Sequence, residues 1–367
     1  MELDEIRLEL DRLDTELIAL FERRMELSLE VAKAKRRDNL PVYQPEREKA
    51  VLDSRAAKLK DPSWRQAARV LMQTVMDLGK DAQMDYLARQ RPVPVVAYQG
   101  VAGGYGEQAA LEHFGTAQWK ACETFGAVVR AVQAGEADYG VLPLENSVTG
   151  PVVQPMDLLA ASGLFIVGER SLPIRHCLVG VAGAQEDGIR QVVSHEQGLA
   201  QCSQYLEAHP AMAVSARRNT AEAARFVAQK GDPACAAVAS SRAAQLYGLS
   251  ILRRDIQNDR DNTTRFVVIA RKSCPGGSKT SVYFVIRNVS GSLQAALEAL
   301  ARHGINLIAL HTRPIPREKW SYGFFADLSG GLDQPHLAAA LEDLRQQCQQ
   351  MTVLGSYQPD PEAEHEG

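Results

Sequence analysis

The sequence lacks the features that would place it among nucleic-acid-binding, membrane or secreted proteins. Its 367 residues carry a net charge of -4, so no basic surface for nucleic acid is indicated. No apolar run approaches the roughly 18 residues that a membrane-spanning helix needs. The start, "MELDEIRLEL", has acidic residues where a signal peptide needs a basic start and an apolar run. We therefore expect a cytoplasmic protein that binds neither nucleic acid nor a membrane.

Paired cysteines are also missing. The six cysteines are scattered and none belongs to a Cys-x-x-Cys pair, which is typical of reduced thiols rather than of a disulfide framework or a zinc site. What is present is ordinary for a globular protein with buried cores, namely 45% hydrophobic and 23% charged residues. The length predicts two or three domains.

Residues 1–90 have the pattern of an all-helical domain. Apolar residues recur at alternating spacings of three and four over the first 35 residues, which predicts one helix roughly 50 Å long. So long a helix exceeds what its own small domain can bury, so we expect a partner chain to cover the apolar stripe. Further helices are expected near 45–60 and 62–89. The stripe consists of Leu3, Ile6, Leu10, Leu13, Leu17, Leu20, Leu27, Val31 and Ala34.

One cation interrupts this stripe. Arg24 stands where an apolar residue is expected, and Lys35 lies on the same face about 16 Å further along, so the two side chains can clasp an anion. Arg7 points about 100° away and lies roughly 25 Å from Arg24, so it reaches such a pocket only from the partner in an antiparallel pair. The alternative is that Arg7 and Lys35 extend into solvent and that Arg24 pairs with a glutamate.

The helical segment resembles the small all-helical chorismate mutases. The matching words are "LDRLDTELIALFERRMELSLEVAKAK", "PEREKAVL" and Gln83. In that family chorismate rearranges to prephenate without a covalent intermediate, which requires positioning and fixed donors rather than a nucleophile. The resemblance implies Arg24 and the partner's Arg7 for the carboxylates, Lys35 and Gln83 for the ether oxygen, and Arg47 and Glu48 near the ring hydroxyl.

Residues 93–272 alternate strands and helices, which predicts an α/β domain. The stretch 164–181 contains two strands around Pro173, so we expect it to cross between two lobes and the strand 265–270 to cross back, with a cleft at the crossings. A dinucleotide site is disfavoured, because the first glycine of "GYGEQA" falls about five residues after the strand ends. The other expected strands are 93–98, 138–142, 164–168, 190–194 and 235–239, and the expected helices are 105–114, 124–134, 196–207 and 220–230.

Polar residues follow several of these strands. Glu145 and Asn146 come after the strand 138–142, at the carboxyl end where open α/β sheets bind ligands. "SHEQGLAQC" (194–202) and "RNTAEAA" (218–224) repeat this layout in the other lobe. Helix capping alone would explain Ser147. The stretch "NDRDNTTRFVVIA" (258–270) brings Thr264 and Arg265 to the start of a buried strand, so we expect them at the floor of the cleft.

In this order the stretches resemble prephenate dehydratase over residues 93–272. The matching words are "GGYGEQAA", "PLENSVTG", "RHCLVG", "SHEQGLAQC", "LYGL" and "NTTRFVVIA". That family has a two-lobed fold like the periplasmic binding proteins, and it converts prephenate to phenylpyruvate with loss of carbon dioxide and water, which implies no metal or cofactor. The resemblance implies Thr264 as the donor beside the departing hydroxyl, and Glu145 as a proton source if the cleft raises its pKa. The implied substrate-binding residues are Asn146, Ser147, Ser194, Gln201, Thr220 and Arg265, the last of which alternatively braces the loop through an ion pair.

Residues 279–357 follow the order βαββαβ, the ferredoxin-like α+β pattern. They resemble an ACT domain, a regulatory module that binds amino acids, and the implied effector is phenylalanine. The binding words G-A-L-V and E-S-R-P of that family stand here as "GSLQ" (291–294) and "HTRP" (311–314), so the alternative is a dimerisation domain with an altered effector site. The acidic tail 358–367 is expected to be disordered. The implied effector-binding residues are Gly291, Leu293, Arg313 and Pro314.

The three segments together predict a homodimeric bifunctional chorismate mutase and prephenate dehydratase whose small-molecule partners are chorismate and prephenate. One alternative is a dehydratase that prefers arogenate, which carries an amino group in place of the side-chain ketone of prephenate. Another is a binding or sensory protein without activity. The cations of the mutase segment argue against the latter, because a receptor for a solute would not need them.

Overall fold

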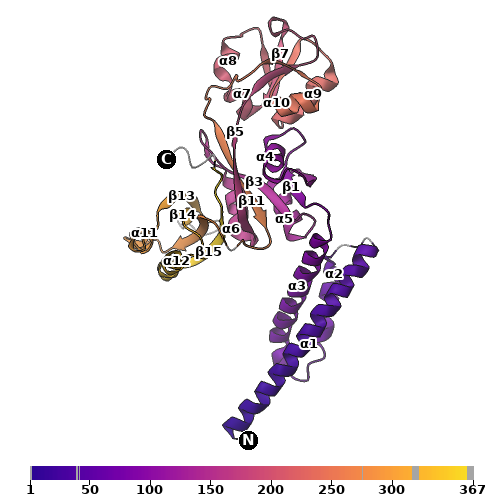
Figure 1. Cartoon of the computed structure of the whole chain (residues 1–367), viewed down its shortest axis with the longest axis vertical. Coiled ribbons are helices and arrows are strands. Elements are labelled where there is room, and N and C mark those ends of the chain that lie inside the picture. The colour runs from indigo at the N-terminus through magenta and orange to yellow at the C-terminus, as the bar shows by residue number, and fades with distance from the viewer. Residues whose placement is uncertain (1, 39, 41, 275, 316–321, 362–367) are drawn as a thin grey trace. The chain divides into compact units, whose positions relative to one another are not determined.

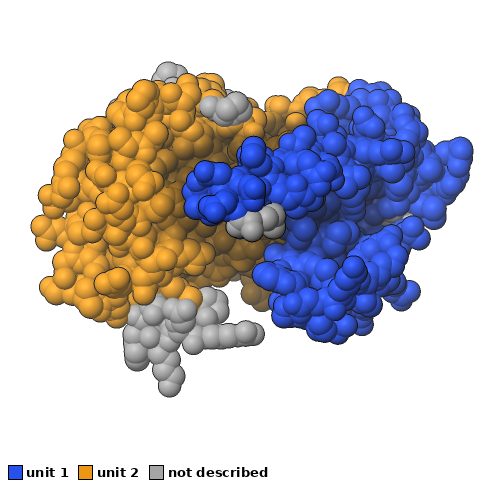
Figure 2. All heavy atoms as spheres, turned by 90° about the horizontal axis from the view of Figure 1, so that it is seen from below, with its two compact units in different colours: residues 1–94 blue, residues 95–367 orange. Residues whose placement is uncertain are grey.

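The computed structural model describes residues 2–361 except 39, 41, 275 and 316–321. The chain forms two compact units, residues 1–94 and residues 95–367, which Figure 2 colours separately. Among the described helices, none has both the length and the apolar character required to cross a membrane.

The first unit is entirely helical (Figure 1). It consists of α1 (Leu3–Arg37), α2 (Pro45–Ala56), a short 3-10 turn (Pro62–Trp64) and α3 (Arg65–Arg89). The single long helix expected from the heptad-like stripe is therefore present. A capping box between Glu2 and Glu5 satisfies backbone donors at its start. Helices α1 and α3 pack along each other.

The apolar stripe of α1 stays open to solvent within one chain. Leu10 is 53% exposed, Leu17 51% and Leu20 66%, and Leu27 is also mostly exposed. An apolar row of this length on one helix is unusual for a surface that stays in water, because burying such side chains is favourable by about 1.5–3 kcal/mol each.

The second unit begins with a two-lobed α/β region. The sheet of the first lobe has the order β2-β1-β3-β11-β5, with β4 paired to β3, and that of the second lobe has the order β10-β6-β9-β7-β8. The first lobe consists of β1 (Val95–Gln99), α4 (Tyr105–Phe114), β2 (Gln118–Cys122), α5 (Phe125–Gln133), β3 (Tyr139–Asn146), β4 (Gly150–Pro151), α6 (Val153–Ser162), β5 (Phe165–Pro173) and β11 (Thr263–Ala270). The second lobe consists of β6 (Cys177–Gly180), β7 (Gln191–His195), α7 (Glu196–Ala200), α8 (Ser203–Glu207), β8 (Ala213–Arg217), α9 (Thr220–Lys230), β9 (Cys235–Ala239), α10 (Ser241–Leu246) and β10 (Ser250–Arg253).

The chain crosses between the lobes twice, as expected. It leaves the first sheet after β5, enters the second sheet at β6, and returns between β10 and β11. Strand β11 lies between β3 and β5 and is antiparallel to both. Two strands extend further than expected, since β3 reaches Asn146 and β11 begins at Thr263. The backbones of these polar residues pair with each other across the sheet, and pairing rather than hydrophobicity sets where the strands end.

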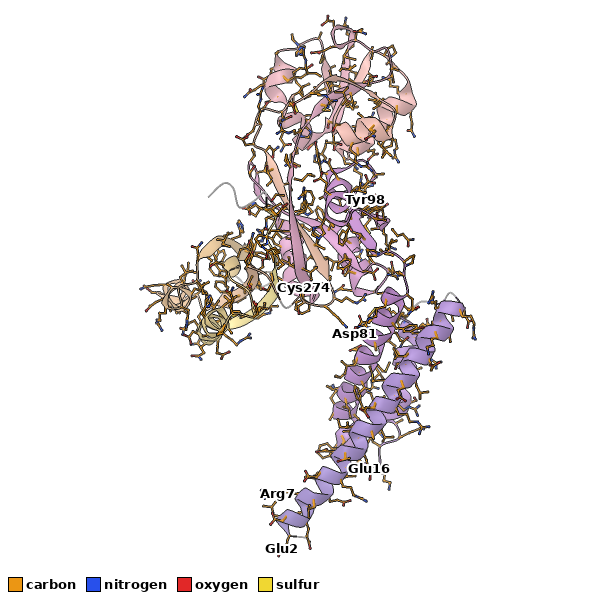
Figure 3. All side chains as sticks on the ribbon, viewed as in Figure 1. Glu2, Arg7, Glu16, Asp81, Tyr98 and Cys274 are labelled. Atoms are coloured by element: carbon orange, nitrogen blue, oxygen red, sulfur yellow. The ribbon has the colours of Figure 1, made fainter. Side chains whose placement is uncertain are left out.

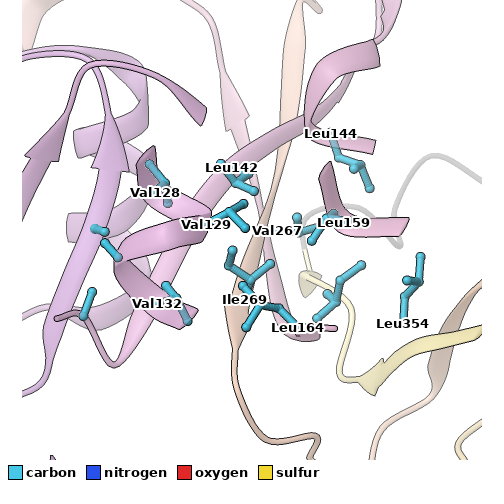
Figure 4. Packing of buried hydrophobic residues seen from close by; sticks show 14 of the residues in the cluster. Val128, Val129, Val132, Leu142, Leu144, Leu159, Leu164, Val267, Ile269 and Leu354 are labelled. Atoms are coloured by element: carbon cyan, nitrogen blue, oxygen red, sulfur yellow. The ribbon is translucent and has the colours of Figure 1, made fainter. Parts of the chain in front are cut away.

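The remaining part of the second unit is a ferredoxin-like domain. It consists of β12 (Lys279–Ile286), α11 (Ser292–Arg302), β13 (Leu307–Pro314), β14 (Tyr322–Ser329), α12 (Pro335–Gln347) and β15 (Cys348–Tyr357). Its sheet has the order β13-β14-β12-β15, and its elements follow one another in the expected order βαββαβ. Part of this domain shares a hydrophobic core with the first lobe, since Phe325, Leu354 and Tyr357 pack in one cluster with Val267 and Ile269 of β11 (Figure 4).

The start of the tail is ordered where disorder was expected. Asp360 is 3% exposed, and one carboxylate oxygen accepts a hydrogen bond from the backbone N–H of Ser171 at 2.6 Å. Its other oxygen pairs with Arg170 at 3.3 Å. The expectation of disorder was wrong at residues 358–361, because a composition-based argument does not include these specific partners. Residues 362–367 of the expected tail lie outside the described residues.

Candidate active sites

Arg24 of α1 contacts α3 near Gly79, on the face of α3 that also carries Gln83. Arg24 Nη1 donates to the carbonyl of Val75 at 2.9 Å, and the guanidinium packs against Gly79, where an added Cβ would lie 3.3 Å from Nη1. Gln83 follows Gly79 by four residues and therefore lies on the same face of α3. Its side chain is buried, and within the described part of the chain its Oε1 has no hydrogen-bond partner. A buried acceptor without a donor is costly, so this amide is suited to receive a ligand.

Lys35 lies near the start of α2. Its Nζ donates to the carbonyl of Val42 at 2.7 Å. Burial lowers the pKa of Lys35; Glu48 opposes this effect and Arg47 reinforces it. Glu48 also pairs with Lys80 of α3 at 2.8 Å. The structure thus brings Lys35, Arg47 and Glu48 into electrostatic contact at one end of the helical unit.

Arg7 stands apart from these residues. Its side chain is 66% exposed, and it pairs only with Asp4 at 3.2 Å within the described part of the chain. Figure 3 shows Arg7 close to the N-terminal end of α1. Within one chain the fold keeps Arg7 away from Arg24, as the length of the helix requires.

A cleft of about 460 Å³ lies between the two lobes of the second unit. Strands β3 and β11 contribute Asn146 and Thr264 to its wall, and β1 is followed by the glycine loop that precedes α4. The second lobe contributes residues from the starts of α7 and α9. The polar side chains that line the cleft include Gln99, Asn146, Thr149, His176, His195, Gln197, Gln201, Arg218, Asn219, Thr220 and Thr264.

Asn146 and Thr264 form a cross-strand pair on the cleft side of the sheet. They lie directly opposite each other in the register of β3 and β11. The side-chain amide of Asn146 donates to Thr264 Oγ1 at 2.9 Å and to Asn262 Oδ1 at 2.7 Å, while its own oxygen accepts from Thr149 Oγ1 at 3.1 Å. Because Thr264 Oγ1 accepts this bond, its hydroxyl proton is available to a ligand in the cleft.

Glu145 and Arg265 are the next pair along these strands, and they point to the opposite face. Successive side chains of a strand alternate between faces, so residues adjacent to Asn146 and Thr264 cannot share their direction. Arg265 Nη1 pairs with Asp327 of β14 at 2.6 Å and Nε pairs with Glu169 of β5 at 2.7 Å. Neither Glu145 nor Arg265 lines the cleft. The ion pair that the sequence left open for Arg265 is present.

The pKa of Glu145 is lowered, which disfavours this residue as a proton source. A polar contact with His311 of β13, whose Nε2 lies 3.5 Å from a carboxylate oxygen of Glu145, lowers the pKa of Glu145, although burial opposes this effect. The same contact raises the pKa of His311. The role of proton source was predicted for Glu145 on the condition that the cleft raises its pKa, and this condition is not met. The cause is the direction of the side chain. Val141 and Pro143 of β3 line the cleft, and the register shift between β3 and β11 at Arg265/Phe266 then places Asn146, and not Glu145, on the cleft side.

The other expected substrate residues divide into two groups. Gln201 and Thr220 line the cleft, and Gln201 Oε1 contacts His176 Nε2 at 2.9 Å. Ser194 is fully buried and donates to the carbonyl of Val238 at 2.6 Å, so it supports the sheet instead of reaching the cleft. Ser147 accepts from the backbone N–H of Thr263 at 3.0 Å and does not line the cleft.

Seven of the polar residues that line the cleft were not predicted as site residues, and three of these seven carry an imidazole or a guanidinium group. His176 is 1% exposed, and burial lowers its pKa, which favours the neutral imidazole. His195 accepts from the backbone N–H of Gln197 at 3.2 Å and caps α7. Arg218 lies between β8 and the cap of α9. The signal for Arg218 was its place directly before "NT", a capped helix start at the carboxyl end of a strand.

The expected effector residues are spread over two elements of the ferredoxin-like domain. Gly291 adopts a left-handed conformation, with φ 82°, at the start of α11, and Leu293 is 36% exposed. Arg313 of β13 forms two parallel hydrogen bonds with Asp157 of α6 in the first lobe, each 3.0 Å long. Pro314 ends β13. One member of this set is thus already paired with the dehydratase-like region.

Three protein-family models match the chain in order. Chorismate mutase type II matches residues 6–84, prephenate dehydratase matches residues 96–274, and the ACT domain matches residues 280–346. The bifunctional chorismate mutase/prephenate dehydratase of Aquifex aeolicus is 35% identical and covers 97% of this chain and 98% of its own length. The protein of the same description from Escherichia coli K12 is 32% identical over 96% of this chain and 95% of its own.

Solved structures resemble about three quarters of the chain. The prephenate dehydratase of Arthrobacter aurescens, in complex with L-Phe, has a TM-score of 0.67 at 28% identity and covers 72% of this chain and 90% of its own. GqqA, described as a novel type of quorum-quenching acylase, has a TM-score of 0.68 at 33% identity and covers 73% of this chain and 99% of its own.

The fold and these matches define a multidomain enzyme that joins a helical mutase, a two-lobed dehydratase with a periplasmic-binding-like fold, and an ACT domain. The chain belongs to the family of bifunctional chorismate mutase/prephenate dehydratases. Its activities are those of a chorismate mutase and a prephenate dehydratase in aromatic amino acid biosynthesis, as the sequence predicted.

Proposed function

We propose that the two activities run in sequence in a cytoplasmic homodimer, with prephenate as the product of the first site and the substrate of the second. The observation that carries the dehydratase assignment is the Asn146–Thr264 pair at the wall of the 460 Å³ cleft. Thr264 there presents a hydroxyl proton to a ligand. A hydroxyl held in this way is suited to the ring oxygen that must depart.

The dehydratase step couples the breaking of two bonds. The bond between the ring and its carboxylate breaks, carbon dioxide leaves, and the electron pair moves into the ring and expels the hydroxyl at the opposite ring carbon. The departing oxygen takes up one proton and leaves as water, and the ring becomes aromatic. Thr264 donates a hydrogen bond to that oxygen as negative charge develops on it, while Asn146 fixes the direction of this donor. A threonine hydroxyl is too weak an acid to lose its proton outright, so the proton itself comes from solvent through this hydroxyl.

For the mutase site we propose that Arg24, Lys35 and Gln83 of one chain and Arg7 of its partner enclose chorismate, with Arg47 and Glu48 near the ring hydroxyl. The unpaired Gln83 oxygen and the partly buried ammonium of Lys35 support this arrangement. In this arrangement the N–H₂ of Gln83 donates to the ether oxygen, and its Oε1 is free to accept from the substrate hydroxyl or from water. The exposed stripe of α1 supports a second chain as the cover.

For regulation we propose phenylalanine as the effector of the ACT domain, at Gly291, Leu293, Arg313 and Pro314. The dehydratase from Arthrobacter aurescens in complex with L-Phe supports this ligand. The Arg313–Asp157 contact supplies a physical connection, since a ligand that recruits Arg313 removes two hydrogen bonds to the dehydratase lobe.

One assay tests these proposals together. The purified chain receives chorismate, and prephenate and phenylpyruvate are followed with and without phenylalanine. Absence of prephenate would exclude the mutase step, and prephenate without phenylpyruvate would exclude the dehydratase step. Rates that stay unchanged at high phenylalanine would exclude the effector. Substrate specificity is tested by offering arogenate in place of prephenate.

A further inference from the structure

Arg218 is the one Lys or Arg side chain among the described residues that line the cleft, and no Asp or Glu accompanies it there. It follows β8, whose end lies beside the end of β7, and it precedes Asn219, which caps α9. The carboxyl ends of parallel strands are where open α/β sheets place ligands. Within the described part of the chain, Arg218 has no hydrogen bond or ion pair, although its neighbour Arg217 stacks on Phe226 at 4.0 Å.

The two carboxylates of prephenate are the groups that Arg218 can bind. Prephenate carries two carboxylates, one on the ring and one on the side chain, and both are attached at the end of the molecule opposite to the hydroxyl. Thr264 lies on the first lobe and Arg218 on the second, so the cleft presents a hydroxyl donor and a cation from opposite lobes. The substrate therefore fits with its hydroxyl toward β11 and its carboxylates toward β8 and α9.

The chemistry decides which carboxylate the cation should hold. The ring carboxylate leaves as neutral carbon dioxide, so a cation bound to it would stabilise the ground state more than the transition state and would slow the reaction. The side-chain carboxylate keeps its charge from substrate to product, so binding it adds affinity without raising the barrier. A cleft with one cation and no other Lys or Arg suits a substrate of which only one carboxylate should be neutralised.

We infer that Arg218 binds the side-chain carboxylate of the dehydratase substrate and thereby favours prephenate over arogenate. This inference rests on the proposed dehydratase function. In arogenate an ammonium group stands next to the same carboxylate and offsets its charge at the guanidinium. Prephenate has an uncharged ketone at that place, so its attraction to Arg218 is stronger.

The test compares Arg218→Gln with Arg225→Gln. Arg225 lies on the same helix as the cap, is exposed, and does not line the cleft, so the two variants have equal net charge. We expect Arg218→Gln to raise KM for prephenate roughly 10- to 100-fold with little change in kcat, the pattern for an interaction made equally in ground state and transition state. Arg218→Lys should retain part of the affinity, and the ratio of kcat/KM for prephenate over arogenate should fall about tenfold in Arg218→Gln.

Mutase activity of the same preparations confirms that each variant is folded. Equal KM values for prephenate in Arg218→Gln and Arg225→Gln would overturn the inference, and so would a loss of kcat at unchanged KM, which would assign Arg218 to the transition state. An unchanged ratio between prephenate and arogenate would overturn the specificity role. If the unmodified enzyme forms no phenylpyruvate from prephenate, the proposed function itself fails, and this control separates the two failures.

Discussion

At the scale of single residues, the role that we propose for Thr264 depends on whether its hydroxyl oxygen already accepts a hydrogen bond, which leaves the proton for a ligand. A free hydroxyl samples several directions, and its proton then points at a ligand only part of the time. The amide of Asn146 donates to Oγ1, and the 2.7 Å bond from the same amide to Asn262 holds it in place. The hydroxyl therefore keeps its donor function for the cleft at little cost in reorganisation.

Replacing Thr264 by valine removes this donor at almost constant volume. We expect kcat for phenylpyruvate formation to fall roughly 100- to 1000-fold, the range found when one preorganised donor to a developing oxyanion is lost. Thr264→Ser should keep most of the activity, because it retains the hydroxyl. Steady-state assays with prephenate provide the measurement, and mutase activity provides the control for folding. Full turnover in Thr264→Val would refute the role of the hydroxyl.

The sequence predicted Thr264 and Asn146 as site residues, but it could not separate them from their neighbours. Glu145 and Arg265 have the same polar character and are adjacent in the chain. Their direction depends on the register between β3 and β11, which shifts between Arg265 and Phe266, and that register comes from backbone pairing between segments more than 100 residues apart in the sequence. Arg218 was missed for a related reason, because β8 is an edge strand with few apolar residues and gave no strand signal.

At the scale of elements, β11 connects the catalytic cleft with the ACT domain. Its even-numbered residues from Thr264 face the cleft and the core around Tyr98, while Arg265, Val267 and Ile269 face the other side. On that side Arg265 bridges Glu169 of β5 and Asp327 of β14, and Lys279 of β12 pairs with Glu169 at 3.0 Å. A shift of the ACT domain therefore acts on the strand that carries Thr264 through a charge pair next to it.

Arg265→Met should destabilise the second unit by about 3–5 kcal/mol, because it leaves the buried carboxylates of Glu169 and Asp327 without their shared cation. Arg265→Lys should recover only part of this loss, since an ammonium cannot reach both carboxylates with a planar fork. Urea unfolding monitored by circular dichroism gives the change for each variant, with mutase activity as an independent report on the first unit. A midpoint equal to that of the unmodified protein would contradict this account.

The contact between Glu145 and His311 makes the link between these domains dependent on pH. The pKa of Glu145 in the folded protein is lowered from its ordinary 4.5, so its contribution to stability is lost as the pH falls through the lowered pKa. The pKa of His311 in the folded protein is raised from its ordinary 6.5, so its contribution is lost as the pH rises through the raised pKa. The pair therefore stabilises the folded protein between the lowered pKa of Glu145 and the raised pKa of His311. The stabilisation is no more than about 1 kcal/mol, because both groups are partly exposed. Arg265 and Asp327, which also act on His311, stay charged across this range.

His311→Gln isolates this contribution. The free energy of unfolding of the variant should be lower than that of the unmodified protein at pH 5.5 and equal to it at pH 9. Denaturant titrations at the two pH values measure the difference, and His336→Gln, a histidine of α12 outside this contact, serves as the control. A difference that is the same at both pH values would show that packing, and not the charge pair, accounts for it.

At the scale of the whole molecule, the sequence predicted the order of the three folds but not the contacts between them. Periodicity and turn residues report on local structure, so α1, the two crossings and the βαββαβ order followed directly. The pairing of Arg313 with Asp157 and the anchoring of Asp360 join segments that are remote in sequence, and composition alone suggested disorder near Asp360. Such contacts depend on how complete domains dock, which no local pattern encodes.

The mutase site leads to a prediction about subunits. Arg7 lies too far along α1 to join Arg24 in one chain, so each site should take Arg24 from one chain and Arg7 from the other. Arg7→Ala and Arg24→Ala should each reduce mutase activity at least about 100-fold, by loss of a charged contact to a carboxylate. Each variant should keep its dehydratase activity, because the cleft lies within a separate unit.

Mixing the two inactive variants should then restore activity. A mixed dimer contains one site with both arginines and one site with neither, so random exchange between equal amounts should recover about one quarter of the unmodified mutase rate. The measurement is prephenate formation after co-refolding, with dimer exchange verified by energy transfer between labelled chains. A matched control refolds each variant alone, which should stay inactive. Exchange without recovery would show that both arginines of a site come from the same chain, and the apolar stripe of α1 would then need another explanation.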